Sequence, residues 1–131
     1  MISVAVIGGG ASGMAFAVAL KQKKPDIEVT VFEKNPKVLK KILVTGNGRC
    51  NILNFDTVAE NYFEACEFVR PAVEKYTPKK TEAIFRDMGL LLMSEQEGRV
   101  YPISQTAASV VCVLSSAAER AGVKVFTDTP V

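Results

Sequence analysis

The chain has 131 residues, which is about the size of one domain. Its 16 basic and 14 acidic residues leave a formal charge of +2, a balance that predicts binding to neither nucleic acid nor a membrane surface. Apolar residues make up 48% of the chain, enough for a buried core, yet no apolar run approaches the roughly 18 residues of a membrane span. Because histidine is absent, histidine-dependent catalytic triads and ordinary zinc sites are excluded within this chain.

The three cysteines, Cys50, Cys66 and Cys112, are odd in number and share no C-x-x-C spacing. A disulfide framework and a metal site are therefore not expected. The first residues also lack the basic stretch that opens a secretory signal peptide. These features predict a cytoplasmic protein whose chemistry depends on carboxylates, lysines, tyrosines, thiols or a cofactor.

The first part of the chain is predicted to form one βαβ unit. The β-branched run over 2–7 predicts a strand that is buried on both faces, and a glycine-rich turn follows it directly. Good helix formers over 11–24 predict a largely buried helix, and the apolar run over 27–32 predicts a second strand. A strand, a glycine turn, a helix and a strand in this order indicate an α/β fold.

The rest of the chain alternates between loop, helix and strand signals. Residues 35–56 are rich in proline, glycine and asparagine and predict a long loop, which more often serves a function than not. Two helices are expected next, one over 59–76 that Pro71 breaks or kinks and one from Pro78 to Met88 with Thr77 as its N-cap. The last expected elements are a hairpin of 90–93 with 99–101, a helix over 104–121 that Gly122 ends, and a strand over 123–126 that joins the parallel sheet.

The glycine-rich turn carries the pattern G-x-G-x-x-G at Gly8, Gly10 and Gly13, between the first strand and the first helix. Gly8 permits the tight turn, Gly10 allows a pyrophosphate to approach the backbone, and Gly13 lets the helix pack on the strand. Glu33 follows Gly13 by 20 residues, at the end of the second strand, where a carboxylate accepts hydrogen bonds from ribose hydroxyls. The alternative is a plain glycine turn with a solvated glutamate, but the combined spacing favours a dinucleotide site.

Residues 45–51 read TGNGRCN and form a second candidate site. Two glycines on either side of an asparagine suggest a backbone pressed against a flat or charged partner, and Arg49 offers a fixed cation beside a phosphate or a ring. The same residues could form an ordinary turn. Cys50 is interpreted as a small buried residue in preference to a redox thiol, because no resolving cysteine lies nearby in the sequence.

The dinucleotide pattern alone leaves NAD and FAD open, and three functions fit it. The first is the FAD-binding part of an oxidoreductase, in which the flavin carries the redox chemistry. The second is an NAD-binding dehydrogenase module, which leaves the TGNGRCN loop unexplained. The third is a non-catalytic nucleotide-binding or assembly module.

Four stretches of the chain read VAVIGGGASGMAFA, VTVFEKN, KKILVTGNGRCNILN and GRVYPISQTAASVVCVL. With them the chain resembles, over essentially its whole length, the predicted flavoproteins of the HI0933-like family. The resemblance implies a bacterial FAD-dependent oxidoreductase, similar to aminoacetone-oxidase-like enzymes, with NAD(P)H as a candidate electron donor. It also implies a Rossmann-like FAD-binding domain of the glutathione-reductase type, with a parallel sheet, flanking helices and a small β-hairpin.

The resemblance further implies a set of cofactor-binding residues. The FAD pyrophosphate would lie at Gly8, Gly10, Ala11, Ser12 and Gly13, and the AMP ribose would lie at Glu33. The other implied residues are Lys34 and Lys41 near the AMP half, Gly46, Asn47, Gly48, Arg49, Cys50 and Asn51 near the flavin or pyrophosphate, and Val131 against the adenine. Leu39 stands where many relatives have glycine, and Tyr101 replaces a frequent phenylalanine.

Similar proteins of this family have an inserted substrate domain and a C-terminal return to the FAD domain. By that resemblance, residues 1–131 are the N-terminal part of an FAD/NAD(P)-binding domain that is incomplete at its C-terminus, with the substrate domain and the C-terminal FAD segment absent. The substrate is expected to be a small molecule that the sequence does not name, and no catalytic residue is assigned. The isolated chain is expected to be inactive and to form a homodimer through uncovered apolar surface.

Overall fold

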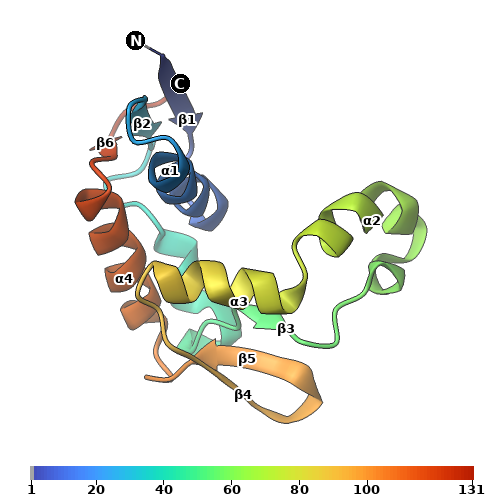
Figure 1. The fold of residues 1–131 in the computed structure, drawn as a ribbon. Helices are drawn as coiled ribbons and strands as arrows, with labels where there is room; N and C mark the ends of the chain where they lie inside the picture. The colour runs from blue at the N-terminus through green and yellow to red at the C-terminus, as the bar shows by residue number, and fades with distance from the viewer. Residues whose placement is uncertain (1) are drawn as a thin grey trace.

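The computed structural model describes residues 2–131, which form two small sheets and four α-helices (Figure 1). The first sheet is parallel, with the order β1–β2–β6, and contains β1 (Ser3–Ile7), β2 (Glu28–Phe32) and β6 (Lys124–Phe126). The second sheet is antiparallel, with the order β3–β5–β4, and contains β3 (Leu53–Asn54), β4 (Leu92–Ser94) and β5 (Arg99–Pro102). The predicted Rossmann-like α/β fold with a small hairpin is therefore confirmed.

The helices lie beside and between these sheets. They are α1 (Ala11–Lys23), α2 (Cys66–Lys75), α3 (Pro78–Asp87) and α4 (Ala107–Arg120), with the 3-10 segments η1 (Lys40–Gly48), η2 (Ala59–Ala65) and η3 (Gln96–Gly98) in the connections. Figure 1 shows α1 and α4 next to the parallel sheet and α2 projecting away from the other helices. None of the helices within residues 2–131 has the length and apolar character needed to cross a membrane.

The first βαβ unit forms as the sequence predicts. β1 and β2 pair in parallel, from Ser3 opposite Glu28 to Ile7 opposite Phe32. β6 joins the other side of β2, also in parallel, so the strand predicted at the end of the chain completes a three-stranded sheet. The turn between β1 and α1 therefore lies at the carboxyl edge of the sheet, the edge at which open α/β sheets bind ligands.

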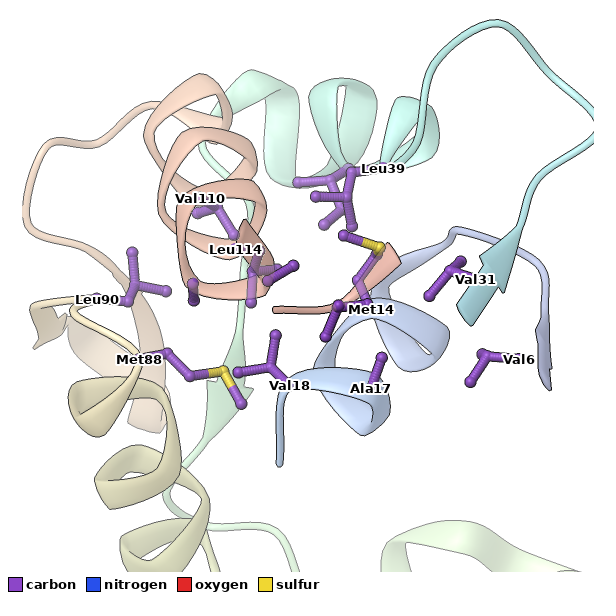
Figure 2. Packing of buried hydrophobic residues seen from close by; sticks show 14 of the residues in the cluster. Val6, Met14, Ala17, Val18, Val31, Leu39, Met88, Leu90, Val110 and Leu114 are labelled. Carbon is purple, nitrogen blue, oxygen red and sulfur yellow. The ribbon is translucent and has the colours of Figure 1, made fainter. Parts of the chain in front are cut away.

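One hydrophobic core joins the parallel sheet to the later helices. α1 buries Met14, Ala17 and Val18, and these belong to the same buried cluster as Val110 and Leu114 of α4. In Figure 2, Met14 and Val18 of α1 and Leu114 of α4 point into the same cluster. This core fixes the N-terminus of α1 relative to both the sheet and the second half of the chain.

The prediction that the first strand is buried on both faces is wrong. Within β1 only Val6 is buried, while Ala5 and Ile7 are exposed. Among residues 2–131, β1 pairs with β2 alone and lies at the edge of the sheet. The expectation of a largely buried first helix is also too strong, since Phe16 is 53% exposed. A β-branched run predicts a strand, but burial depends on what distant segments pack against it.

The single helix expected over 59–76 is divided, and at a different residue from the one predicted. Phe63 in η2 has a φ of 49°, and α2 begins at Cys66. Pro71 lies inside α2 and does not end it, because the fixed φ of proline is helical. Since α2 buries no residue, water can bind the carbonyl that loses its N–H partner. The long loop expected over 35–56 likewise contains η1 and β3.

The other predicted boundaries are close to those observed. Thr77 Oγ1 accepts a hydrogen bond from the Lys80 N–H at 3.4 Å, so Thr77 caps α3 as expected. β4 and β5 form the predicted antiparallel hairpin. Gly122 has a φ of 73°, the left-handed conformation that ends α4.

Leu39 has a left-handed backbone conformation, with a φ of 60°, at the residue that precedes η1. Its N–H donates to the Gly9 carbonyl at 2.7 Å, and its own carbonyl accepts from the Ile42 N–H at 3.0 Å. The side chain is 1% exposed and lies in the core near Met14 (Figure 2). Packing of the leucine side chain therefore offsets a backbone strain of roughly 1–2 kcal/mol.

Leu39→Ala is expected to destabilise the chain by about 2–5 kcal/mol, because it removes a buried leucine side chain. Leu39→Gly is expected to be milder by about 1 kcal/mol although it removes more atoms, since glycine adopts a positive φ without strain. Urea unfolding of the wild type and the two variants measures this order. A glycine variant that is less stable than the alanine variant would contradict the strain argument.

Candidate cofactor site

The turn at 8–10 joins β1 to α1 at the carboxyl edge of the parallel sheet. Gly8 has a φ of 100°, which favours glycine, and its N–H donates at 2.8 Å to a carbonyl at the end of β2. Gly10 is the N-cap residue of α1, and no side chain among residues 2–131 caps this helix. Ala11 and Ser12 are exposed, and their N–H groups have no partner within the helix and are available to an anion.

Each glycine of the turn meets a different constraint. A Cβ on Gly13 would lie 2.1 Å from the Gly8 carbonyl oxygen, so α1 approaches the turn closely only because residue 13 is glycine. A Cβ on Gly9 would lie 2.5 Å from Val38 Cγ1. A Cβ on Gly10, by contrast, would meet no atom of residues 2–131 within 4 Å. The space at Gly10, beside the uncapped N-terminus of α1, fits a bound phosphate group.

Glu33 is buried at the end of β2, and both of its carboxylate oxygens accept hydrogen bonds from within the chain. The Gly9 N–H donates to Oε2 at 2.7 Å, and Asn35 donates to Oε1 from its N–H at 2.8 Å and from Nδ2 at 2.6 Å. The Asn35 N–H, followed by the Gly9 N–H, lowers the pKa of the Glu33 carboxyl from its ordinary value of 4.5. The carboxylate is therefore ionised near neutral pH and holds the glycine turn against β2.

A cavity of about 330 Å³ opens beside Glu33, at the carboxyl ends of β1 and β2. Four of the predicted cofactor residues line it, namely Gly8, Glu33, Lys34 and Val131. The C-terminal residues reach this edge because the Thr129 N–H donates to the Glu33 carbonyl at 2.9 Å. The volume of the cavity lies in the range of small-molecule pockets, about 300–1,000 Å³. Its position at the carboxyl edge of the sheet suits a nucleotide.

Two residues of this cavity, Asn35 and Thr129, were missed by sequence reasoning. The Glu-x-Asn spacing after the second strand was a usable signal for Asn35, since a short amide side chain two residues away can reach the carboxylate. Thr129 had no such signal. It meets Glu33 through backbone atoms of two segments that are distant in the sequence, so its side-chain type carries no information about the contact.

The loop at 45–51, the second candidate site, has an unusual backbone. Gly46, Asn47 and Gly48 have φ values of 53°, 54° and 81°, so three consecutive residues are left-handed. Cys50 follows with a φ of 61° and is buried, which agrees with its interpretation as a small buried residue. Asparagine and cysteine pay a conformational cost in this region that glycine does not, so the surrounding contacts must hold the loop in place.

A second cavity, of about 170 Å³, lies between this loop and the N-terminus of α1. Its lining includes Ala11 from α1 together with Thr45, Cys50 and Asn51 from the loop. The remaining lining is apolar and comes from η1, α3, α4 and Ile52, which precedes β3. The loop at 45–51 and the start of α1, which follows the glycine turn, therefore lie next to each other in space.

The guanidinium of Arg49 already contacts other side chains of the chain. Its Nη1 donates to the two carboxylate oxygens of Glu95 at 3.0 and 3.2 Å and to Gln105 Oε1 at 3.0 Å. Its guanidinium carbon lies 4.0 Å from the centre of the Tyr101 ring. The structure thus places this predicted cation on the hairpin and the segment before α4, where a carboxylate already balances its charge.

The remaining predicted residues lie outside both cavities. Lys41, Gly46, Asn47 and Gly48 are exposed and line neither of them. The part of the chain that the structure describes holds no group of three or more His, Cys, Asp or Glu residues suited to a metal ion. The geometry therefore centres the site on the glycine turn, Glu33 and the first turn of α1.

A protein-family model described as the HI0933-like protein Rossmann domain matches residues 2–131 of the chain. The chain belongs to the HI0933-like family. The resemblance inferred from four short stretches of sequence is thereby confirmed, and so is the Rossmann-like class of its fold.

Two curated relatives match nearly all of this HI0933-like domain. The 3-dehydro-bile acid delta(4,6)-reductase of Clostridium scindens is 38% identical over 128 residues, which are 97% of this chain and 31% of the relative. The ribosomal RNA dihydrouridine synthase of Haemophilus influenzae is 29% identical over 122 residues, which are 92% of this chain and 30% of the relative. The chain thus spans less than a third of the length of these relatives.

A solved structure has the same architecture. The crystal structure of Thermovibrio ammonificans THI4 matches with a TM-score of 0.62 and 17% sequence identity, covering 96% of this chain and 38% of that one. At this level of identity the likeness shows the fold alone. It places the HI0933-like domain among α/β folds built around a parallel sheet.

The hydrogen bonds to Glu33 predict an acid-sensitive fold in this HI0933-like domain. Because the folded-state pKa of Glu33 is lowered, its contribution to stability is complete above about pH 4.5 and is lost as the pH falls through the folded pKa. Glu33→Gln removes this titration. The free energy of unfolding of the variant is therefore expected to fall less steeply below pH 4.5 than that of the wild type.

Urea unfolding at a series of pH values, from neutral to about pH 3, measures this difference. Glu28, whose pKa is lowered mainly by its hydrogen bond from the Lys124 ammonium, titrates in both proteins and leaves a residual slope. Equal slopes in the wild type and in Glu33→Gln would contradict the prediction.

Proposed function

We propose that this domain binds FAD as part of an oxidoreductase. The pyrophosphate would lie at the glycine turn and the first turn of α1, and the AMP ribose and adenine would occupy the cavity of about 330 Å³ beside Glu33. The observation that carries the proposal is the open space at Gly10, next to an uncapped helix N-terminus and a buried carboxylate. Amide donors suit a phosphate, and a carboxylate acceptor suits ribose hydroxyls.

The second cavity continues from Ala11 at the start of α1 toward the loop at 45–51, so a dinucleotide has a place to extend beyond its adenine half. FAD is favoured over NAD as that dinucleotide because the chain belongs to the HI0933-like family, whose flavoproteins it resembles. FAD, when bound, supplies hydride transfer between an electron donor and the substrate. The residues of this chain bind and orient that group, and NAD(P)H is the proposed electron donor of the full-length protein.

The names of the two relatives suggest a substrate class. One reduces the Δ4 and Δ6 double bonds of a 3-dehydro (3-oxo) bile acid, and the other forms dihydrouridine in ribosomal RNA. Both reactions saturate a C=C bond that is conjugated with a carbonyl group. We therefore propose that the full-length protein reduces such a bond, adding a hydride and a proton across it while NAD(P)H becomes NAD(P)⁺.

The test is to purify the full-length protein and record its absorbance, then to identify the cofactor released by denaturation. Bound FAD supports the proposal. A colourless protein that binds NAD refutes the FAD proposal and supports the dehydrogenase alternative. The substrate class is tested by following NAD(P)H oxidation with a 3-oxo-4-ene steroid, which is a small molecule as the sequence predicts. Uridine-containing ribosomal RNA is the second test substrate, and its reduction would contradict the prediction that the protein binds no nucleic acid. A cytoplasmic location is part of the proposal and is supported by the free thiols of Cys50, Cys66 and Cys112.

A further inference from the structure

The loop at 45–51 is held in a conformation that its own residues disfavour. Asn47 and Cys50 have positive φ values although neither is glycine. Gly46 has no room for a side chain, because a Cβ there would lie 2.8 Å from the Asn51 nitrogen and 3.4 Å from Tyr101 Cε1. A backbone in this state persists only when neighbouring contacts determine it, and such segments concentrate at ligand sites.

Backbone hydrogen bonds from Arg49 to Gly46 and from Cys50 to Thr45 close the loop on itself, and the side chain of Arg49 joins it to other parts of the fold. Its guanidinium stacks at 4.0 Å on Tyr101, which is buried in β5, while Nη1 bonds Glu95 at the start of the hairpin turn and Gln105 before α4. An isolated surface ion pair contributes little to stability. Here the planar guanidinium contacts a ring, a carboxylate and an amide at the same time. Arg49 therefore ties the loop to two other elements of the fold.

The loop in turn forms one wall of the second cavity. Thr45, Cys50 and Asn51 line it, together with Ala11 at the N-terminus of α1. A shift of the loop backbone would change this cavity without disturbing the glycine turn or Glu33, which are held by separate hydrogen bonds.

We infer that Arg49 is a positioning residue, which fixes the loop at 45–51 against the ring system of a flavin through Glu95, Gln105 and Tyr101. It does so without contributing its own charge to the cofactor. The inference rests on the proposed FAD-binding function. It predicts that weakening this contact set alters the environment of the flavin and its reduction while FAD remains bound, because the phosphate and ribose sites are left intact.

The test uses the full-length protein with three variants. Arg49→Lys keeps the charge but loses the planar stacking and the multiple hydrogen bonds, and Glu95→Gln weakens the same contact from the other side. Arg99→Lys is the matched control. Arg99 lies on the same hairpin as Glu95 and Tyr101, and it pairs with the exposed Glu97. Flavin content, the visible absorbance bands of the bound flavin, the rate of its reduction by NAD(P)H and the thermal unfolding midpoint are measured for each.

Arg49→Lys and Glu95→Gln are expected to retain FAD, to shift the flavin bands and to slow flavin reduction by at least tenfold, while Arg99→Lys matches the wild type. Two results would overturn the inference: a lower unfolding midpoint with unchanged bands and rate, or an effect of Arg49→Lys that Glu95→Gln does not share. The second pattern would indicate direct contact between Arg49 and the cofactor. A wild-type protein without flavin would instead refute the proposed function, and this inference with it.

Discussion

Gly10→Val is expected to abolish FAD binding by the full-length protein while leaving its fold intact. Gly10 has a φ of −76° and a ψ of −175°, an extended conformation that valine adopts readily. A Cβ at this residue meets no atom of residues 2–131 within 4 Å, so the folded chain accommodates the new side chain. The isopropyl group would instead fill the space beside the first N–H groups of α1, where the pyrophosphate is proposed to lie.

Gly13→Val is the matched comparison, because it adds the same side chain to the same motif. Its Cβ would lie 2.1 Å from the Gly8 carbonyl oxygen, a contact that only a backbone shift can relieve. We therefore expect Gly13→Val to lower the thermal unfolding midpoint strongly, and Gly10→Val to leave it near the wild-type value. Circular dichroism gives the midpoint, and flavin absorbance per protein gives the occupancy.

The two variants separate loss of the ligand from loss of the fold. FAD affinity of Gly10→Val is expected to fall by at least a hundredfold, since blocking the phosphate site removes several charge-assisted hydrogen bonds together. If the variant purifies with wild-type flavin content, the phosphates bind elsewhere. If it fails to fold, the space seen at Gly10 is occupied by a part of the full-length protein.

Local signals were sufficient to predict the first βαβ unit. A β-branched run, three glycines and a set of helix formers each act over a few residues, so the strand, turn and helix could be located from the sequence. The burial of β1 could not be predicted in this way, because it depends on which distant segments of the chain pack against the strand. Pro71 shows the same limit in a helix, since proline often breaks a helix but α2 continues through it.

The candidate site also has a part that local sequence signals predict and a part that depends on the folded structure. Gly10, Gly13 and Glu33 were predicted from their spacing, because the geometry of a βαβ unit fixes where those residues lie. Arg49 was singled out for its type, but its partners Glu95 and Gln105 come from a hairpin and a turn that the loop meets only after folding. A cation recognised in the sequence is available to a ligand only where the fold leaves its charge unpaired.

Glu33→Ala is expected to weaken FAD binding by at least tenfold in the full-length protein. In the proposed complex the carboxylate accepts charge-assisted hydrogen bonds from the ribose, and the substitution removes them. It also releases the Gly9 N–H, which donates to Glu33 Oε2 at 2.7 Å, so the glycine turn loses a contact that holds it against β2. The ribose and phosphate sites are therefore weakened together.

Glu33→Gln is expected to be almost as damaging as Glu33→Ala, although it keeps the shape of the side chain. Both carboxylate oxygens already accept from N–H donors, those of Gly9 and Asn35, so the glutamine amide group must point its own N–H toward one of them. Glu28→Gln is the control, since Glu28 lies at the other end of β2 and pairs with Lys124. Fluorescence titration of the apoprotein with FAD measures the FAD affinity of the wild type and of the three variants. Wild-type affinity in Glu33→Ala would refute the ribose assignment, and wild-type affinity in Glu33→Gln alone would show that the two N–H donors find other acceptors once the charge is gone.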